Sequence, residues 1–218
     1  MARSFSKQER EIIRQRLVEK GRELFSTVGV KKTSIDELTQ AVGIAKGSFY
    51  AFFNSKEEMY LDILEMEENS IRAQFMAQVI QGKPITKETF KSFILEGIRV
   101  METNPLFRRM YEKSELEQVL RKVPPERLSR HVKSDEDWVL GLVTEWQARG
   151  LVIDADPQAI TGAIKFVIAS SLLKDSIGGQ NYPQSIELLA ELVAEGLISR
   201  LYGRDSMEVD DGSCSQSS

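Results

Sequence analysis

Apolar positions recur at helical spacing along almost the whole chain. Between residues 7 and 28, Leu17, Leu24, Phe25 and Val28 fall on one face of a helix that Gly29 would end. The same spacing predicts further helices over residues 87–103, 105–122, 125–149, 157–176 and 183–202. No segment alternates apolar and polar residues over the length of a strand. The pattern therefore predicts an all-α fold.

Two capping boxes divide the N-terminal region. Ser34–Glu37 has the sequence of a capping box and predicts a helix that starts there and is broken at residues 42–44. A short helix then follows through Phe53. Ser55–Glu58 is a second capping box, and the helix that it opens could continue to about residue 82. Such a helix would be roughly 40 Å long, at about 1.5 Å per residue.

Residues 33–56 follow the order of a helix-turn-helix: a helix, a turn that contains glycine, and a second short helix. In such a unit the N-terminal residues of the second helix meet base edges in the major groove. Lys46, Gly47 and Ser48 hold that position. A lysine can bond guanine, a serine can donate or accept, and a glycine lets the backbone come close. The hydroxyl of Tyr50 could bind a phosphate. Thr33 and Lys56 lie beside helix N-termini, whose free N–H groups also bind phosphate.

Over residues 7–65 the chain resembles the DNA-binding domain of the tetracycline-repressor family. The order and spacing agree in Leu24–Gly29, Thr33–Leu38, Ala41–Tyr50, Phe53 and Ser55–Glu58. The resemblance implies that Ala45, Lys46, Gly47 and Ser48 contact bases, and that Thr33, Lys46, Tyr50 and Lys56 contact phosphates. It also implies that Phe49 and Phe53 are core residues. The chain departs from the family at Ala51 and Phe52, where many members carry a polar side chain or a histidine that touches the DNA backbone.

The same resemblance implies the architecture of the rest of the chain. We expect a three-helix helix-turn-helix domain at residues 1–55, a larger helical effector-binding and dimerisation domain at 56–204, and a disordered tail at 205–218. The expected function is that of a homodimeric regulator, a repressor in the family's usual mode, which binds a palindromic operator in double-stranded DNA. A small hydrophobic or amphipathic ligand would release it.

The last two predicted helices could form a two-fold interface. Residues 158–173 are apolar or small on nearly every side, and the final helix has an apolar stripe. The expected interface residues are Ile164, Ile168, Leu172, Ile186, Leu189, Val193, Gly196 and Leu197. These helices could instead be buried within one chain. The dimer is favoured because one chain has one reading helix, whereas palindromic half-sites need two, about 34 Å apart.

The middle helices carry methionines and aromatic residues, which form adaptable apolar cavities. The candidates for a ligand pocket are Met66, Phe93, Met101, Phe107, Met110, Tyr111, Trp138, Leu142, Trp146 and Phe166. Residues of these types at helical spacing can equally be ordinary core.

The distribution of charge agrees with one DNA-binding end. Residues 1–56 hold 11 Lys/Arg and 6 Asp/Glu, a net charge of +5, whereas the other residues hold 18 and 27, a net charge of −9. No apolar run approaches the roughly 18 residues of a membrane span, and residues 1–6 lack the apolar segment of a secretory signal. The one cysteine, Cys214, cannot form a disulfide within the chain, which suggests the cytoplasm.

Catalysis and metal binding are not expected. The single histidine, His131, follows Leu128 by three positions, so no Glu-x-x-His motif of a di-iron site exists. His131 is expected on the surface, and Cys214 lies in the polar tail. There is no glycine-rich phosphate loop, so no cofactor is expected. Two non-enzymatic alternatives remain open: a DNA-binding protein of this family without a small-molecule effector, and a helical adaptor that binds only protein.

Overall fold

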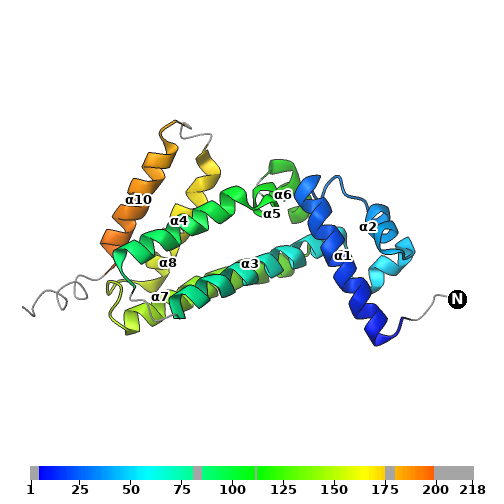
Figure 1. The fold of residues 1–218 in the computed structure, drawn as a ribbon, viewed down its shortest axis with the longest axis horizontal. Coiled ribbons are helices and arrows are strands. Elements are labelled where there is room, and N and C mark those ends of the chain that lie inside the picture. The colour runs from blue at the N-terminus through cyan, green and yellow to red at the C-terminus, as the bar shows by residue number, and fades with distance from the viewer. Residues whose placement is uncertain (1–4, 81–84, 111, 175–179, 199–218) are drawn as a thin grey trace, which may run out of the picture. The chain divides into compact units, whose positions relative to one another are not determined.

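The computed structural model describes residues 5–80, 85–110, 112–174 and 180–198, and in these ranges the fold is all-α (Figure 1). The helices are α1 (Lys7–Thr27), α2 (Ile35–Val42), the 3₁₀ helix η1 (Lys46–Ala51), α3 (Lys56–Ile80), α4 (Lys87–Thr103), α5 (Pro105–Met110), α6 (Lys113–Lys122), α7 (Pro125–Ala148), α8 (Pro157–Ala169), the 3₁₀ helix η2 (Ser170–Leu173) and α10 (Tyr182–Leu197). Within the described ranges the only β pairing is a single antiparallel bridge between Val152 and Ile198. The predicted fold class is confirmed.

The chain divides into two compact units. The first unit holds residues 1–83 and 97–135, and the second holds residues 84–96 and 136–218. The first unit contains the segment 1–55 together with α3, α5, α6 and the start of α7. The expected domain boundaries at residues 55 and 204 stay predictions. The expected tail at 205–218, with Cys214, lies outside the described residues.

The first unit is built around the apolar face of α1. Leu17 and Phe25 on α1 are fully buried, and they share a core with Leu38 of α2, Phe49 of η1 and residues of α3. Gly21 lets α3 come close, because a Cβ at this position would lie 2.9 Å from the Cδ1 atom of Ile63. The ring of Tyr60 lies edge-on to that of Phe25, and its hydroxyl donates to the carbonyl of Leu106 at 2.7 Å. One core thus joins α1, α3 and α5.

Gly29 ends α1 as predicted. Its φ of +88° lies in the left-handed region, and its N–H donates to the carbonyl of Leu24. The side chain of Glu115, from α6, occupies the space that a Cβ on Gly29 would need. The glycine is therefore required both for the backbone conformation and for the approach of α6.

Three predicted helices differ from what the apolar pattern indicates. The segment 105–122 forms two helices, α5 and α6, because the chain turns after α5 and Glu112 donates its N–H to the carbonyl of Arg109. The segment 157–176 changes from α-helix to 3₁₀ helix after Ala169. The helix predicted to reach residue 202 stops at Leu197, where Ile198 enters the bridge to Val152.

In the second unit, α8 and α10 lie side by side (Figure 1). The end of α10 is tied to the loop before α8, because Ile153 donates its N–H to the carbonyl of Leu197 at 2.9 Å. Phe90, Phe93 and Trp146 form an aromatic cluster with ring centroids 5.7–6.2 Å apart. No helix among the described residues combines the length and the apolar character that crossing a membrane requires.

Candidate nucleic-acid interface

The helix that precedes the predicted reading segment begins and ends as its sequence dictates. The Ser34 hydroxyl accepts the N–H of Glu37 at 3.2 Å, and the Glu37 carboxylate accepts the N–H of Ser34 at 2.7 Å, so the predicted capping box is formed. These hydrogen bonds hold the pKa of Glu37 below its usual value. Gly43 ends α2 with a φ of +75°. The chain therefore leaves α2 in a sharp turn.

The second element of the unit is the 3₁₀ helix η1. Phe49, the fourth residue of η1, is fully buried, and its ring packs against that of Phe53 with centroids 5.7 Å apart. This anchor fixes which residues of η1 face outward. Ala45, Lys46, Gly47 and Tyr50 are exposed, and Ser48 is half-buried. We call Ala45–Ser48 the reading segment.

Lys46 is held by an acidic neighbour. Its ammonium group donates to the Asp36 carboxylate at 2.6 Å, and this hydrogen bond raises the pKa of Lys46 above its usual value. Both side chains are more than half exposed. Because both groups are exposed to solvent, the ion pair is weak, and Lys46 can exchange Asp36 for another anion.

Gly47 is not required by the fold. Its φ is not in the left-handed region, and among the described residues beyond its chain neighbours and its own helix backbone no atom lies within 4 Å of the position that a Cβ would take. The space beside Gly47 is open to a partner that approaches the backbone.

The predicted phosphate contacts have different environments. Tyr50 is 56% exposed. Thr33, in contrast, is 1% exposed, and its hydroxyl donates to the carbonyl of Gly29 at 2.8 Å. Lys56 is half-buried and donates to the carbonyls of Thr33 at 2.6 Å and Lys31 at 3.2 Å. Thr33 and Lys56 thus hold the loop before α2 in shape.

The same loop has two further exposed cations, Lys31 and Lys32, which are not among the contacts predicted from the sequence. The signal that could have found them is a pair of consecutive lysines directly before a capping box. They add positive charge next to the N-terminus of α2, whose free N–H groups favour anions.

The departure from the family pattern at Ala51 and Phe52 has a structural use. The Arg10 guanidinium lies 5.3 Å from the centroid of the Phe52 ring and donates to the carbonyl of Ala51 at 2.9 Å. The ring of Phe5 packs on the same ring, with centroids 6.1 Å apart. These two positions bind η1 to α1.

The loop that leads into α2 is also held from the side of α5 and α6. Glu115 of α6 is 4% exposed, and its carboxylate accepts the backbone N–H of Lys31 at 3.0 Å. Arg109 of α5 donates to the carbonyls of Ser26, at 3.0 Å, and Thr27, at the end of α1. The first unit thus fixes both ends of the segment between α1 and α2.

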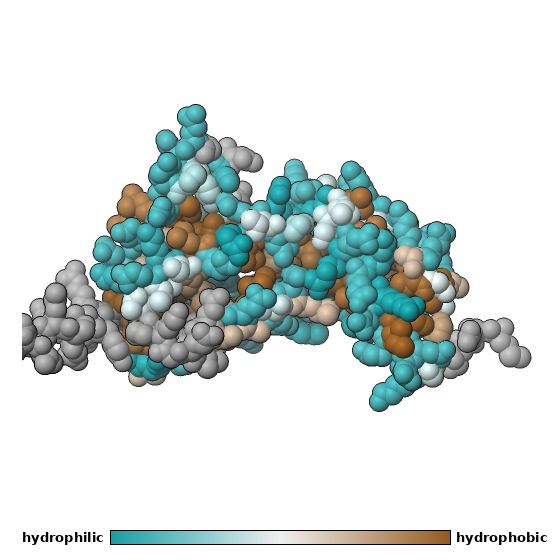
Figure 2. All heavy atoms as spheres, viewed as in Figure 1, coloured by the Kyte–Doolittle hydropathy of each residue, from teal (hydrophilic) through white to brown (hydrophobic). Residues whose placement is uncertain are grey.

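The residues predicted for a dimer interface lie mostly inside the second unit. Ile164 and Leu197 are buried, and Ile168, Ile186, Leu189 and Val193 are half-buried. The side chain of Leu172 lies outside the described residues, and Gly196 is exposed. The structure places a different set of apolar residues on the surface of α8 and α10, where Figure 2 shows brown atoms. This exposed apolar face consists of Ala159, Gly162, Ala163, Phe166, Ala169, Leu188, Leu192 and Gly196.

The ten candidates for a ligand pocket are not brought into one group. In the first unit Phe107 is a core residue, and Met101 and Met110 pack against the same core. In the second unit Phe93 and Trp146 belong to the aromatic cluster, Leu142 is buried and Trp138 is half-buried. Met66 and Phe166 are exposed, and Tyr111 lies outside the described residues. A pocket built from these residues stays a prediction.

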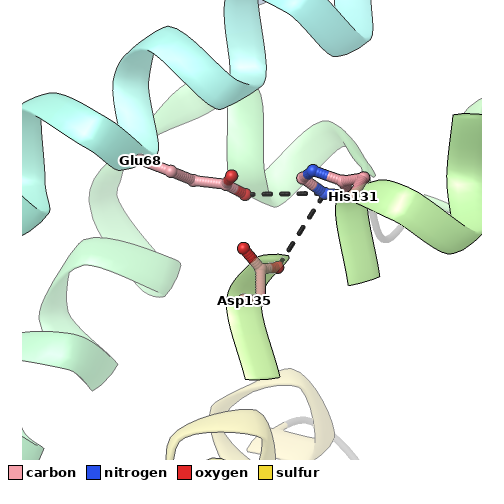
Figure 3. A group of neighbouring side chains, drawn as sticks. All are labelled: Glu68, His131 and Asp135. Atoms are coloured by element: carbon pink, nitrogen blue, oxygen red, sulfur yellow. Dashed lines mark ion pairs between the residues drawn. The ribbon is translucent and has the colours of Figure 1, made fainter. Parts of the chain in front are cut away.

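The expectation that His131 lies on the surface is wrong. His131 is 9% exposed, and its Nε2 atom faces the carboxylates of Glu68 and Asp135, at 3.7 Å and 3.9 Å (Figure 3). Burial, and the nearby charges of Asp135 and Glu65, raise the pKa of Glu68 to about 8. This cluster was not predictable from the sequence, because Glu68 lies on α3 whereas His131 and Asp135 lie on α7, and only packing brings them together.

The comparisons with known proteins agree with the fold and with the helix-turn-helix. Residues 17–63 match the family model of the bacterial regulatory proteins of the tetR family. The transcriptional regulator AcrR of Shigella flexneri is 37% identical over 71 residues, 33% of this chain and 33% of AcrR. The transcriptional repressor DhaR of a Mycobacterium species is 40% identical over 53 residues, 24% of this chain and 27% of DhaR. The chain thus matches a third or less of the length of these curated relatives.

The likeness of fold extends much further than the likeness of sequence. The crystal structure of a TetR-family transcriptional regulator from Pectobacterium atrosepticum superimposes with a TM-score of 0.67 over 90% of this chain and 99% of that one, at 21% identity. The sequence match therefore covers the reading unit, and the fold match covers nearly the whole chain. Residues 17–63 are thus similar to the bacterial regulatory proteins of the tetR family, and the fold of nearly the whole chain is similar to that of the solved regulator.

Proposed function

We propose that this protein is a sequence-specific DNA-binding transcriptional regulator, and that it acts as a repressor. The observation that carries the proposal is the reading segment, Ala45–Ser48, which is presented outward on η1 by the buried anchor Phe49. A helix-turn-helix reads base edges with residues in this position. Because a transcriptional regulator acts where the chromosome lies, the proposal implies the cytoplasm.

The reading segment would contact both bases and backbone. Lys46 would leave Asp36 and bond guanine O6 and N7 or a phosphate, and Ser48 would donate to or accept from a base edge. Gly47 would let the backbone approach the groove. The Tyr50 hydroxyl would donate to a phosphate, and the exposed Lys31 and Lys32 would add to the phosphate contacts.

The regulator would act as a homodimer on a palindromic operator, since one chain carries one reading segment. The exposed apolar face of α8 and α10 supports this step. Phe166, Leu188 and Leu192 are 74%, 58% and 56% exposed in the single chain. A second copy packed on this face would remove these side chains from water, and Gly162, Ala163 and Gly196 would let the helices come close.

Release from DNA would follow the binding of a small hydrophobic or amphipathic ligand. The support is the abundance of aromatic and methionine side chains in the helices after α2, at Phe93, Met101 and Trp146 among others. The ligand would act by binding one arrangement of the protein more tightly than the DNA-bound one.

The test of DNA binding uses the operator that the purified protein selects from a pool of random duplexes. We expect Lys46→Ala to weaken the affinity for that operator by about tenfold or more, as expected for the loss of 1–3 kcal/mol of base contact. Tyr50→Phe, which removes a single phosphate contact, should weaken it less. The matched control is Lys133→Ala, which removes the same charge from an exposed position on α7.

The salt dependence of binding separates a DNA-binding protein from an adaptor that binds only protein. Affinity should fall steeply between low and moderate salt, because phosphate contacts release counterions. If no duplex is enriched over random sequence, or if Lys46→Ala and Tyr50→Phe both bind like the control, the proposed reading residues are wrong.

A further inference from the structure

A buried histidine between α3 and α7 is surrounded by carboxylates. The Nε2 atom of His131 lies 3.7 Å from Oε1 of Glu68 and 3.9 Å from Oδ2 of Asp135, and one ligand atom of each of the three residues lies within 4.8 Å of the others. Figure 3 shows the three side chains pointing toward a common space. His131 and Asp135 are four residues apart on α7, so they share one face of that helix, and Glu68 faces them from α3.

These distances are near those of a metal site. Two ligand atoms that are each about 2.1 Å from a metal in tetrahedral geometry lie about 3.4 Å apart. The two separations from the Nε2 atom of His131, 3.7 Å and 3.9 Å, exceed this value by a few tenths of an ångström, and the ligand atoms of Glu68 and Asp135 lie within 4.8 Å of each other. Small rotations of the two carboxylates would therefore complete a site with one nitrogen and two oxygen ligands.

The second ring nitrogen of His131 faces a further carboxylate. The Nδ1 atom of His131 is buried without a hydrogen-bond partner in the described part of the chain, and Oε1 of Glu65 faces it at 3.3 Å. A carboxylate at the second ring nitrogen is the usual partner of a metal-bound histidine, because it fixes the tautomer that leaves Nε2 free. Glu65 is itself held by Arg127, at 2.5 Å.

Asp135 is oriented in the same manner. Arg72 donates to its Oδ1 atom, and Oδ2 is the oxygen that faces His131. The guanidinium thus fixes the carboxylate and leaves one oxygen toward the common space of Figure 3.

The balance of charge also favours a cation. Asp62 pairs with Arg14 and Arg127, Glu65 with Arg127, and Asp135 with Arg72. Among the described side chains, the ion-pair partner of Glu68 is His131 alone, although the Glu68 side chain is only 15% exposed. Two ligand carboxylates would balance the charge of a divalent ion.

We propose that Glu68, His131 and Asp135 bind a divalent first-row transition metal ion such as Zn²⁺. The mixed nitrogen and oxygen ligands favour this class, since Mg²⁺ and Ca²⁺ prefer oxygen ligands alone and Cu⁺ prefers sulfur. The ion would join α3 to α7 within the first unit. The proposal is independent of DNA binding, because its residues take no part in the reading segment.

The test measures metal binding by the full chain. The protein is prepared without an affinity tag in a Cys214→Ser background, so that no added histidine and no thiol can bind metal, and is stripped with EDTA. Zn²⁺ is titrated by calorimetry, and Co²⁺ is used as a spectroscopic probe because its visible absorption reports the ligand geometry. We expect one ion per chain and a melting temperature raised by Zn²⁺.

Variants of the three proposed ligands should weaken Zn²⁺ binding more than a variant of Glu65, which would only orient His131. Glu68→Gln, His131→Gln and Asp135→Asn should each weaken the affinity for Zn²⁺ by at least about 100-fold, whereas Glu65→Gln should weaken it about 10-fold through the orientation of His131. Asp137→Asn is the matched control, since Asp137 is exposed on α7 two residues after Asp135. Circular dichroism of the metal-free variants shows that each is folded.

The proposal is overturned by a stoichiometry of zero at micromolar Zn²⁺. It is also overturned if Zn²⁺ raises the melting temperature of Glu68→Gln and of the parent protein equally. A variant that does not fold leaves the comparison of Glu65→Gln with Asp137→Asn as the deciding one, and equal affinities for Zn²⁺ in that pair would contradict the orientation of a metal-bound His131 by Glu65.

Discussion

Gly43 and Gly47 lie four residues apart, and the chain uses them for different reasons. Gly43 has a φ of +75°, a conformation that other residues adopt only at a cost, whereas the backbone of Gly47 is open to any residue. Apart from the chain neighbours and the local helix backbone, no atom in the described part of the chain lies within 4 Å of the missing Cβ of either glycine. Gly43 therefore serves the turn, and the reason for Gly47 lies outside the chain, in the proposed approach of DNA.

Substitution by alanine separates the two roles. We expect Gly43→Ala to lower the free energy of unfolding by about 1–2 kcal/mol, the cost of a left-handed backbone for a residue with a Cβ. Gly47→Ala should leave the free energy of unfolding unchanged or slightly raised, and should weaken operator binding about tenfold or more. Urea unfolding and fluorescence anisotropy measure the two effects. Equal operator affinity of Gly47→Ala and the parent protein would contradict the proposed close approach.

Glu68 makes stability depend on pH. Its pKa in the folded protein is about 8, above its usual value of 4.5, so the folded state holds this proton more tightly than the unfolded state. The contribution of this group to stability is complete at pH below its unfolded pKa and is lost as the pH rises through about 8. The loss is on the order of a few kcal/mol.

Glu68→Gln removes that titration. In EDTA, the free energy of unfolding of the parent protein should fall between about pH 5 and pH 9 more steeply than that of the variant. The variant should be the more stable of the two at pH 9. Parallel curves over this range would show that Glu68 does not titrate as its burial requires.

At the scale of the element, the break between α5 and α6 allows these two helices to contact different parts of the segment between α1 and α2. In one continuous helix over 105–122, the positions of Arg109 and Glu115 relative to each other would be fixed by the helix geometry. The turn between them instead lets Arg109 bind the end of α1 while Glu115 binds Lys31. Two short helices thus hold two successive parts of the DNA-binding region.

The hydrogen bond from Glu115 should be measurable as stability. Glu115→Ala leaves the Lys31 N–H without its partner and opens a cavity beside Gly29, so the free energy of unfolding should fall by about 1–3 kcal/mol. Glu117→Ala, at an exposed position of the same helix, should change it by less than about 0.5 kcal/mol. Urea denaturation of the two variants provides the comparison. Equal midpoints would show that the hydrogen bond between Glu115 and Lys31 does not contribute to the free energy of unfolding.

The elements whose signals are local were predictable from the sequence. The capping box at Ser34, the stop at Gly29 and the helix at residues 87–103 depend on residues next to one another, and all three are confirmed. The break inside 105–122 was not predictable, since it depends on what Arg109 and Glu115 contact more than 80 residues away. The burial of His131 was missed for the same reason: its neighbour Glu68 is close only in the folded chain.

At the scale of the whole molecule, the largest unexplained feature of the single chain is the exposed apolar face of α8 and α10. Periodicity identified the two helices but not which side faces out. Ile164 faces inward at 1% exposure, whereas Phe166, two positions later, is 74% exposed. A helix that is apolar nearly all round gives no contrast from which its outer side could be inferred.

Charge on that face should dissociate the proposed dimer. We expect Leu192→Glu to convert the protein from dimer to monomer in analytical ultracentrifugation and to weaken operator binding, with the circular dichroism spectrum unchanged because the position is exposed. Leu120→Glu is the matched control, since Leu120 on α6 is 55% exposed, as Leu192 is 56% exposed. A dimer that survives Leu192→Glu and Phe166→Glu would place the interface elsewhere.

The contact of Glu115 with Lys31 has a consequence for how a signal could reach DNA. The Glu115 carboxylate accepts a hydrogen bond from the main-chain N–H of Lys31, and it fills the space that a Cβ on Gly29 would need. Lys31 is three residues before Ser34, the N-cap of α2. A displacement of α6 would therefore shift the backbone that leads into α2, the helix that precedes the reading segment. A signal that follows this path would be carried by one hydrogen bond to the main chain and by the core that α6 shares with α1 and α2 through Val119.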